Sequence, residues 1–454
     1  MAFLSVLAAA AGFLITIGIV VVIHEGGHFL AAKWLGFAVK RFSIGMGRVL
    51  WRRRGWDTEF AFSMLPIGGY VSFHESARDE AGRPVKGFLF ETGPRWRRAV
   101  VIVAGPLMNF VLAVLLFTAA GAAGVEDFVP RGAALPGSQA ESLGVERLDR
   151  VTAVEGRPVS GLMELNSALV ERTGEKDVAI EFDRRGERMT LHFSLADVSL
   201  DGATKRGGLV LPLLGLRPAG EGVLVVETMK DGPAAAAGLV AGDVIRSADG
   251  RPVAMRDFAA MIRENAGRTL TLEVESLGGG SSAAPGALRT VRLTPRSVTD
   301  ERTGEVIGRA DLRFGEGMER ILVRRGSLES LRVAVSRTVG LTRLQASAVG
   351  GMATGEVSTE SLSGPVGIAG MAGGALVSGL APFLEFLALI SIAIGFMNLI
   401  PIPALDGGQL VILAGEALAG RSLSRGVREK LALASMALLA LLAVYVTIND
   451  IGRL

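Results

Sequence analysis

The chain has 454 residues, of which 49% are hydrophobic and only 20% are charged, and its mean hydropathy is +0.42. These values exclude an ordinary soluble protein and indicate membrane spans joined to soluble domains. The net charge of +3 is too small to indicate nucleic-acid binding, and the absence of cysteine excludes disulfides, thiol nucleophiles and Cys-ligated zinc.

Four apolar segments are long enough to cross a membrane as helices, at residues 3–23, 99–123, 382–399 and 431–448. No basic residues precede the first segment and a histidine motif closes it, so we do not expect a cleaved signal peptide. The sequence therefore predicts a polytopic α-helical membrane protein with four transmembrane helices.

The short loops between these spans are basic. Residues 29–98 contain thirteen Lys and Arg against six acids, and residues 400–430 add four more Lys and Arg. Because basic loops stay on the cytoplasmic side, we expect residues 124–381 on the opposite side of the membrane. The Arg run at residues 52–54 could suit nucleic acid, but beside a membrane it is more typical of contact with anionic lipid headgroups.

A titratable motif, His24-Glu25-Gly26-Gly27-His28, ends the first span. Two imidazoles four residues apart share a helical face and suit one zinc ion, while the Glu between them can handle a water's proton. Placing titratable side chains inside a membrane costs free energy, so such residues usually have a function. The alternative is a pair of histidines satisfied at a helix end. The two glycines are expected to serve close helix packing.

Two strands are predicted after the first span, at residues 42–47 and 58–70. The alternation of Phe60, Phe62 and Met64 favours a strand over a helix. By itself the pattern is also consistent with an ordinary amphipathic hairpin on the cytoplasmic surface.

An internal repeat follows the second span. Residues 144–149 and 156–159 recur at residues 238–243 and 250–253, at a constant offset of 94 residues. Each copy continues with a predicted helix and two predicted strands. The helices are expected at residues 162–171 and 255–265, and the strands at residues 177–182 and 189–193 in the first copy and at residues 269–274 and 289–293 in the second.

The second copy, from Gly232-Pro233 to Val253, resembles the PDZ domains of bacterial envelope proteases. The first copy departs from the pattern, with Leu148 where the second has Gly242, so its peptide-binding loop is less certain. The resemblance implies two extracytoplasmic α+β PDZ domains, at residues 124–215 and 216–300. PDZ domains commonly bind peptide C-termini by strand addition, although the pair could also serve only as a spacer or a size-excluding plug.

Residues 301–381 are expected to form a linker with an amphipathic helix at 327–349. Its apolar residues recur at near-helical spacing, so this helix could lie on the membrane surface or pack as a plain linker on the second repeat.

A second polar motif, residues 398–408, ends the third span. Pro401 and Pro403 cannot continue a helix, so the chain should unwind before Asp406. Irregular backbone at this depth is tolerated where it lines a cavity. The predicted topology places Asp406 on the same side as the histidine motif. Alternatively, Asp406 only starts a turn, and Asn398 and Asn109 only join helices by hydrogen bonds.

Together with residues 104–110, the two motifs resemble the site-2 protease family of intramembrane zinc metalloproteases, and the order of elements resembles its bacterial sigma-E-pathway branch. The resemblance covers nearly the whole chain. It implies Zn²⁺ held by His24, His28 and Asp406, Glu25 as general base, Asn398 holding the substrate, and Asn109 close to the active site. It also implies that the hairpin, through the strand with Phe60, Phe62 and Met64, pairs with unwound substrate in the membrane.

The implied function is a zinc-dependent endopeptidase of the bacterial inner membrane that cuts single-span proteins near the cytoplasmic side. An anti-sigma factor trimmed by another protease is the expected substrate, and remnant signal peptides are a second class. The rival is a non-catalytic PDZ adaptor with a vestigial metal site. A hydrolase acting on lipid or prenylated ends would leave the repeat unexplained. The expected domains are residues 1–123, 124–215, 216–300, 301–381 and 382–454.

Overall fold

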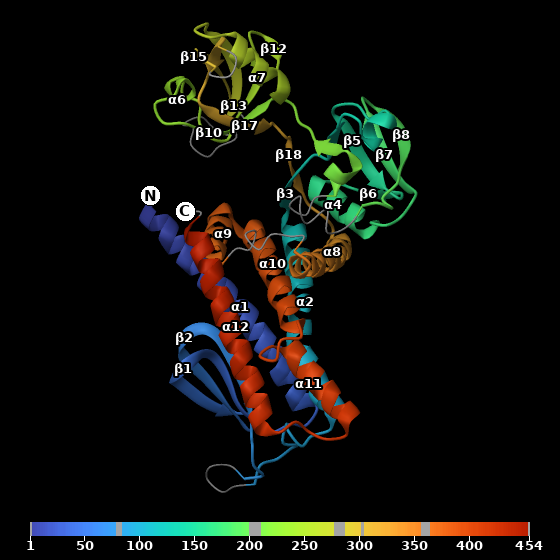
Figure 1. Cartoon of the computed structure of the whole chain (residues 1–454), viewed down its shortest axis with the longest axis vertical. Coiled ribbons are helices and arrows are strands. Elements are labelled where there is room, and N and C mark those ends of the chain that lie inside the picture. Colours follow the sequence, from blue (N-terminus) through green and yellow to red (C-terminus); the bar gives the residue numbers. More distant parts are fainter. Residues whose placement is uncertain are drawn as a thin grey trace. The chain divides into compact units, whose positions relative to one another are not determined.

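A computed structural model describes residues 2–78, 84–198, 210–276, 287–300, 304–355 and 364–452. The chain divides into two compact units, which Figure 1 shows in one view. The first unit joins Met1–Val125 to Arg324–Leu454, and the second is Glu126–Val323.

Within the described part of the first unit, four helices are long and apolar enough to cross a membrane, which confirms the four predicted spans. They are α1 (Ala2–Trp34), α2 (Arg95–Ala123), α10 (Leu380–Leu399) and α12 (Arg425–Ile451). Helix α1 runs well past the predicted end at residue 23 and carries the whole histidine motif. Helix α2 packs against both α1 and α10, so it lies between the segments that hold the two motifs.

Two shorter helices of this unit were not predicted, α9 (Pro365–Ser378) and α11 (Asp406–Ala419). Each has 14 residues, which is too few to span a bilayer, so neither contains the long apolar run that predicts a membrane helix. Helix α9 packs on α1. The Asp450 carboxylate at the end of α12 caps α9 by accepting hydrogen bonds from the backbone N–H groups of Gly364 (2.9 Å) and Gly367 (2.8 Å).

Helix α8 (Ser327–Ala353) covers the predicted amphipathic helix and packs on α2 and α10. The residues it buries are small, among them Ser330, Ala334 and Thr338. The larger apolar residues of its stripe are exposed, namely Leu328, Leu331, Val335 and Val339. This outward apolar stripe fits a helix that lies on the membrane surface.

Strands β1 (Val39–Gly55) and β2 (Thr58–Phe73) form the predicted hairpin and fold back on themselves. Their turn places Trp56 and Asp57 at positive φ, as hairpin turns of the primed type require. Phe42 is opposite Phe60 on one side and opposite Val71 on the other. Residues 69–73, the edge segment, therefore form one edge of this sheet.

The second unit contains two sheets of identical strand order, β8-β7-β5-β4-β9 and β14-β13-β11-β10-β17, which confirms the repeat. We call residues 131–218 the first repeat and residues 223–316 the second repeat. The first repeat consists of β4 (Arg131–Ala134), α3 (Gln139–Ser142), β5 (Asp149–Val154), β6 (Arg157–Pro158), α4 (Leu162–Glu171), β7 (Val178–Arg184), β8 (Glu187–Phe193), η1 (Leu211–Leu214) and β9 (Leu216–Pro218).

The second repeat follows the same order with an added hairpin. It consists of β10 (Val223–Thr228), α6 (Pro233–Ala236), β11 (Asp243–Ala248), β12 (Arg251–Pro252), α7 (Met255–Glu264), β13 (Leu270–Ser276), β14 (Leu288–Leu293), the hairpin β15 (Arg296–Thr299) and β16 (Val306–Arg309), and β17 (Leu312–Glu316). Strands β3 (Val125–Phe128) and β18 (Arg320–Val323) pair where the chain enters and leaves the unit.

Both repeats extend beyond the predicted boundaries at residues 215 and 300. The strands β9 and β17, which lie at one edge of each sheet, come after those boundaries. Both strands are short and lie far along the chain from the repeated sequence motif. The motif therefore could not predict them. The domain limits of 124–215 and 216–300 are therefore corrected to include them.

The first repeat keeps the turn that its sequence seemed to lack. Leu148 and Gly242 both have positive φ, at 75° and 93°. Their N–H groups donate equivalent hydrogen bonds of 2.9 Å to the carbonyls of Gly132 and Val225. Leu148 therefore adopts a conformation that favours glycine, and the surrounding fold imposes it.

Each repeat also buries the aspartate that follows this turn and pairs it with an arginine. Asp149 is 2% exposed and lies 2.6 Å from Arg184, and Asp243 is fully buried and lies 2.5 Å from Arg289. A buried carboxylate needs such a partner, because an unpaired charge is costly away from water.

We predict that Asp243→Ala lowers the free energy of unfolding of the second repeat by about 3 kcal/mol, because Arg289 loses its partner and the Val240 N–H its acceptor. Urea unfolding of residues 126–323 measures it. Glu275→Ala removes the more exposed pair with Arg246 and should cost less than about 1 kcal/mol. Equal losses in the two variants would contradict the account.

Candidate metal centre

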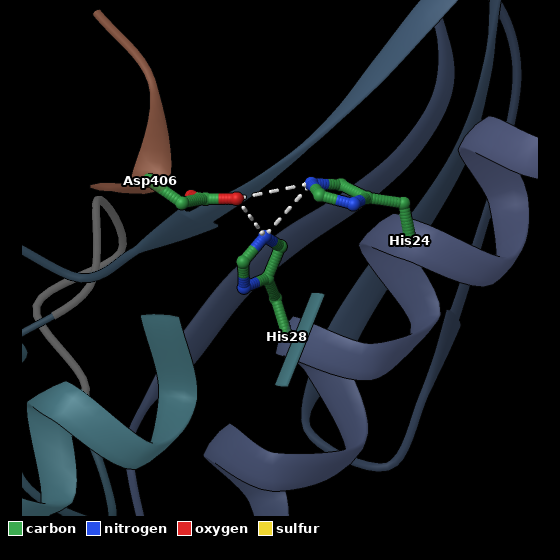
Figure 2. A group of neighbouring side chains, drawn as sticks. All are labelled: His24, His28 and Asp406. Carbon is green, nitrogen blue, oxygen red and sulfur yellow. Dashed lines mark hydrogen bonds and ion pairs between the residues drawn. The ribbon is translucent and has the colours of Figure 1, made fainter. Parts of the chain in front are cut away.

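Three side chains from opposite ends of the chain converge on one point, as Figure 2 shows. His24 and His28 project from α1, and Asp406 begins α11. The Asp406 Oδ2 atom lies 3.2 Å from His24 Nε2 and 3.4 Å from His28 Nε2, and the two Nε2 atoms are 3.2 Å apart. We call these three residues the metal centre.

The spacing of these atoms fits a four-coordinate zinc ion. Ligand atoms about 2.0–2.1 Å from a tetrahedral zinc lie about 3.3 Å from one another, close to the three observed distances. Asp406 Oδ2 is buried and receives no hydrogen bond from the residues that the structure describes. A cation would satisfy this oxygen and both imidazole nitrogens together, whereas three acceptors without one repel each other.

The backbone of α2 orients His28. Its Nδ1 atom lies 2.8 Å from the carbonyl oxygen of Val101. A carbonyl only accepts, so Nδ1 carries the proton and donates, which leaves the lone pair of Nε2 facing the metal centre. No sequence pattern predicts this role of Val101, because its backbone carbonyl, and not its side chain, orients His28.

The side chain of Asn109, which is fully buried on α2, supports His24. Its Nδ2 atom lies 3.2 Å from His24 Nδ1, while its Oδ1 atom is buried without a partner. Rotating the amide by half a turn exchanges these two atoms and lets a protonated Nδ1 donate to Oδ1. That arrangement satisfies the orphaned oxygen and frees Nε2 of His24 as a ligand. Asn109 was predicted to lie close to the active site, and the structure places its amide against His24.

Glycines bring α1 and α2 close enough for these contacts. A Cβ atom at Gly105 would overlap the His28 ring, and one at Gly27 would overlap the backbone of Ala104. Gly26 differs, because a Cβ atom there meets nothing within 4 Å. Of the two motif glycines predicted to serve packing, the structure supports that role for Gly27 alone.

The chain unwinds before Asp406 as predicted from the two prolines. Helix α10 ends at Leu399, Ile400 is extended, and α11 begins at Asp406. Cβ atoms at Gly407 and Gly408 would overlap the backbone of Leu399 and Ile402. The small residues thus let the first turn of α11 lie directly on the unwound segment and set the position of Asp406.

A cavity of about 370 Å³ adjoins the metal centre. Glu25 and Gly69 of the edge segment both line this cavity. They lie side by side, because a Cβ atom added at Gly69 would be only 3.1 Å from Glu25 Cγ. The other residues that line it are His24, His28, Tyr70, Val71, Phe73, Phe90, Val101, Ile102, Asn398, Ala404, Leu405, Asp406 and Gln409. The Glu25 carboxylate, the metal centre and the edge segment therefore share one cavity.

The predicted substrate-binding residues divide into two groups. Asn398 lines the cavity and donates a hydrogen bond of 3.0 Å to the carbonyl of Ile394. Phe60, Phe62 and Met64 do not line it: Phe60 packs against Phe29, and Phe62 and Met64 are 45% and 53% exposed. The fold-back of the hairpin instead brings the edge segment there, and alternation of apolar residues could not reveal that fold-back.

Comparison with known proteins gives consistent matches along the whole chain. The model of peptidase family M50 matches residues 12–442. The chain is similar to the regulator of sigma E protease of Haemophilus influenzae (32% identity, covering 99% of this chain and 100% of that one) and to the regulator of sigma-E protease of Escherichia coli (32%, 99% and 100%). It is also similar to a Neisseria meningitidis protein named provisionally as a zinc metalloprotease (30%, 97% and 98%).

We predict that Gly105→Ala lowers zinc affinity at least about tenfold, because the added methyl group displaces the His28 ring. Competition with a chromophoric chelator measures it on purified protein. Gly26→Ala, which adds the same group in open space, should bind zinc like the wild type. Equal affinities in the two variants would contradict this packing account.

A second prediction concerns Asn109. Asn109→Leu should weaken zinc binding about 10–100-fold, because His24 loses the partner that fixes its tautomer. Asn109→Asp, which keeps an acceptor oxygen, should retain most of the affinity. Ser391→Ala is the control, since Ser391 donates only to the backbone carbonyl of Asn109. Wild-type affinity in Asn109→Leu would show that the amide does not support the site.

Proposed function

The chain belongs to peptidase family M50, a family of zinc metalloproteases, and we propose that it is an intramembrane endopeptidase cutting the transmembrane segments of single-span proteins. One observation carries the proposal: the metal centre and Glu25 share a cavity that is built onto a candidate membrane-spanning helix. Titratable groups in such a helix are costly and normally serve function.

The chemistry needs an ion, a base and a bound peptide. His24, His28 and Asp406 would hold zinc, which when bound polarises the scissile carbonyl and makes water more acidic. Glu25 takes the proton of the attacking water and then delivers it to the leaving amine. Its place in the cavity beside the two histidines suits both transfers.

The edge segment is the proposed docking strand for the substrate. A transmembrane helix hides its carbonyls in hydrogen bonds, so it must be extended before it can be cut. An edge strand offers unpaired backbone groups to an extended chain, and this one lies against Glu25. Asn398 lies on the same cavity and is proposed to hold the extended chain through its amide. Phe60, Phe62 and Met64, outside the cavity, would contact only more distant parts of a substrate.

The proposal for the substrate class is supported by the names of two relatives, each of which is called a regulator of sigma E protease. We propose an anti-sigma factor already trimmed by another protease, with remnant signal peptides as a second class. The basic loops would face the cytoplasm and the two repeats the periplasm of a bacterial inner membrane. There the repeats would screen substrates, binding peptide C-termini at the edge strands β9 and β17.

A non-catalytic adaptor with the same repeats is the alternative. An adaptor has no use for a carboxylate beside three converging ligand atoms, and burying such a group costs stability. The intact metal centre and Glu25 therefore favour the peptidase.

We predict that Glu25→Gln binds about one zinc ion per chain, like the wild type, yet loses at least about 100-fold in cleavage rate. The assay uses purified full-length protein in detergent and a test protein with one transmembrane helix, labelled at both ends. Undiminished cleavage by the variant would refute the role of Glu25. A wild type that neither binds zinc nor cleaves would favour the adaptor.

A further inference from the structure

Helix α11 carries a second acidic residue, Glu416, near the end opposite Asp406. It is 1% exposed, and its carboxylate group is completely buried. Nothing in the proposed chemistry uses this residue, and it lies outside the metal centre. A carboxylate in such a place is tolerated only when other groups compensate its charge.

Three groups surround this carboxylate. The backbone N–H of Leu423 donates to Glu416 Oε1 at 2.9 Å, and the Arg428 guanidinium donates to the same oxygen. The Arg98 guanidinium lies 3.9 Å from the other oxygen. Burial raises the pKa of Glu416, but the Leu423 amide and the two guanidinium groups outweigh it and keep the pKa below its ordinary value. The group is therefore a charged anchor.

The anchor joins elements that are distant in sequence. Arg428 belongs to the first turn of α12 and also lies 3.8 Å from Glu91. Arg98 belongs to the start of α2, donates to the carbonyl of Glu91 at 3.3 Å and lies over the Phe90 ring. Glu416 thus ties α11 to α2, to the segment before α2 and to α12.

Two of the three helices that meet at Glu416, α2 and α11, are the two that complete the metal centre around α1. Helix α2 supplies the Val101 carbonyl to His28 and the Asn109 amide to His24. Helix α11 supplies Asp406, whose Oδ2 atom receives no hydrogen bond that could hold it in place. The position of that oxygen therefore depends on how α11 is held. Gly407 and Gly408 fix one end of the helix by close packing, and Glu416 fixes the other against α2.

We propose that Glu416 is a positioning residue for the metal centre, which sets α11 against α2 and so holds the Asp406 carboxylate at ligand distance from the two histidines. The proposal rests on the proposed zinc site. It predicts that the charge of Glu416 affects metal binding although Glu416 does not touch the metal.

The test measures metal binding of full-length Glu416→Gln in detergent. Zinc affinity comes from chelator competition, and the visible spectrum of the cobalt-loaded protein reports ligand geometry. We expect zinc affinity about tenfold below that of the wild type and an altered cobalt spectrum. Glu385→Gln is the matched control, because Glu385 also pairs with a largely buried arginine, Arg337, on helices that carry no ligand. It should bind both metals like the wild type even if it unfolds at a lower temperature.

A second variant covers the case in which Glu416→Gln does not fold. Arg428→Lys keeps the positive charge but loses the planar fork that contacts Glu416, so a smaller loss of zinc affinity is expected. Wild-type zinc affinity and an unchanged cobalt spectrum in whichever variant folds would overturn the proposal. An equal loss of affinity in Glu385→Gln would overturn it too, because the effect would then be general destabilisation. A wild type that binds no zinc would instead refute the metal centre itself.

Discussion

The convergence of three ligand atoms on one point requires the two ends of the chain to be held close together. The Nε2 atoms of His24 and His28 and the Oδ2 atom of Asp406 lie 3.2–3.4 Å from one another in a largely buried site. Without a cation such an arrangement is unfavourable, and with one it becomes a strong tie between the two ends of the chain. The helices around the site must therefore hold these three atoms close together.

Close backbone approach is the means by which the helices do this. Gly27 and Gly105 bring α2 against α1, so that a carbonyl and an amide of α2 reach the far sides of both imidazoles. Gly407 and Gly408 bring α11 onto the unwound end of α10 in the same way. In a membrane, where apolar side chains gain little by leaving lipid, packing through small residues is an effective way to join helices. The same close contacts therefore pack the helices and position the metal ligands.

The sequence predicted the parts whose signal is local. The four long spans, the helix Leu162–Glu171 and the metal-ligand spacing of the histidine motif need only neighbouring residues, and the structure shows each of them. Helices α9 and α11 were not predicted because each has only 14 residues, which is too few to show the long apolar run typical of a membrane span. The position of the edge segment beside Glu25 was not predicted, because it depends on how the hairpin folds back on itself. Alternating apolar residues predict a strand, but they do not predict which strand pairs with it. Supporting roles such as that of the Val101 carbonyl have no side-chain signature at all.

X-ray absorption spectroscopy of the zinc-loaded protein would identify the ligands of the bound ion. A metal centre built from His24, His28 and Asp406 should give a shell of nitrogen and oxygen ligands at about 2.0–2.1 Å, without sulfur, and outer-shell scattering from two imidazole rings. In Asp406→Asn the same two rings should remain while the oxygen contribution changes. A spectrum with one imidazole or none, or one that is the same in Asp406→Asn, would contradict a metal centre built from His24, His28 and Asp406.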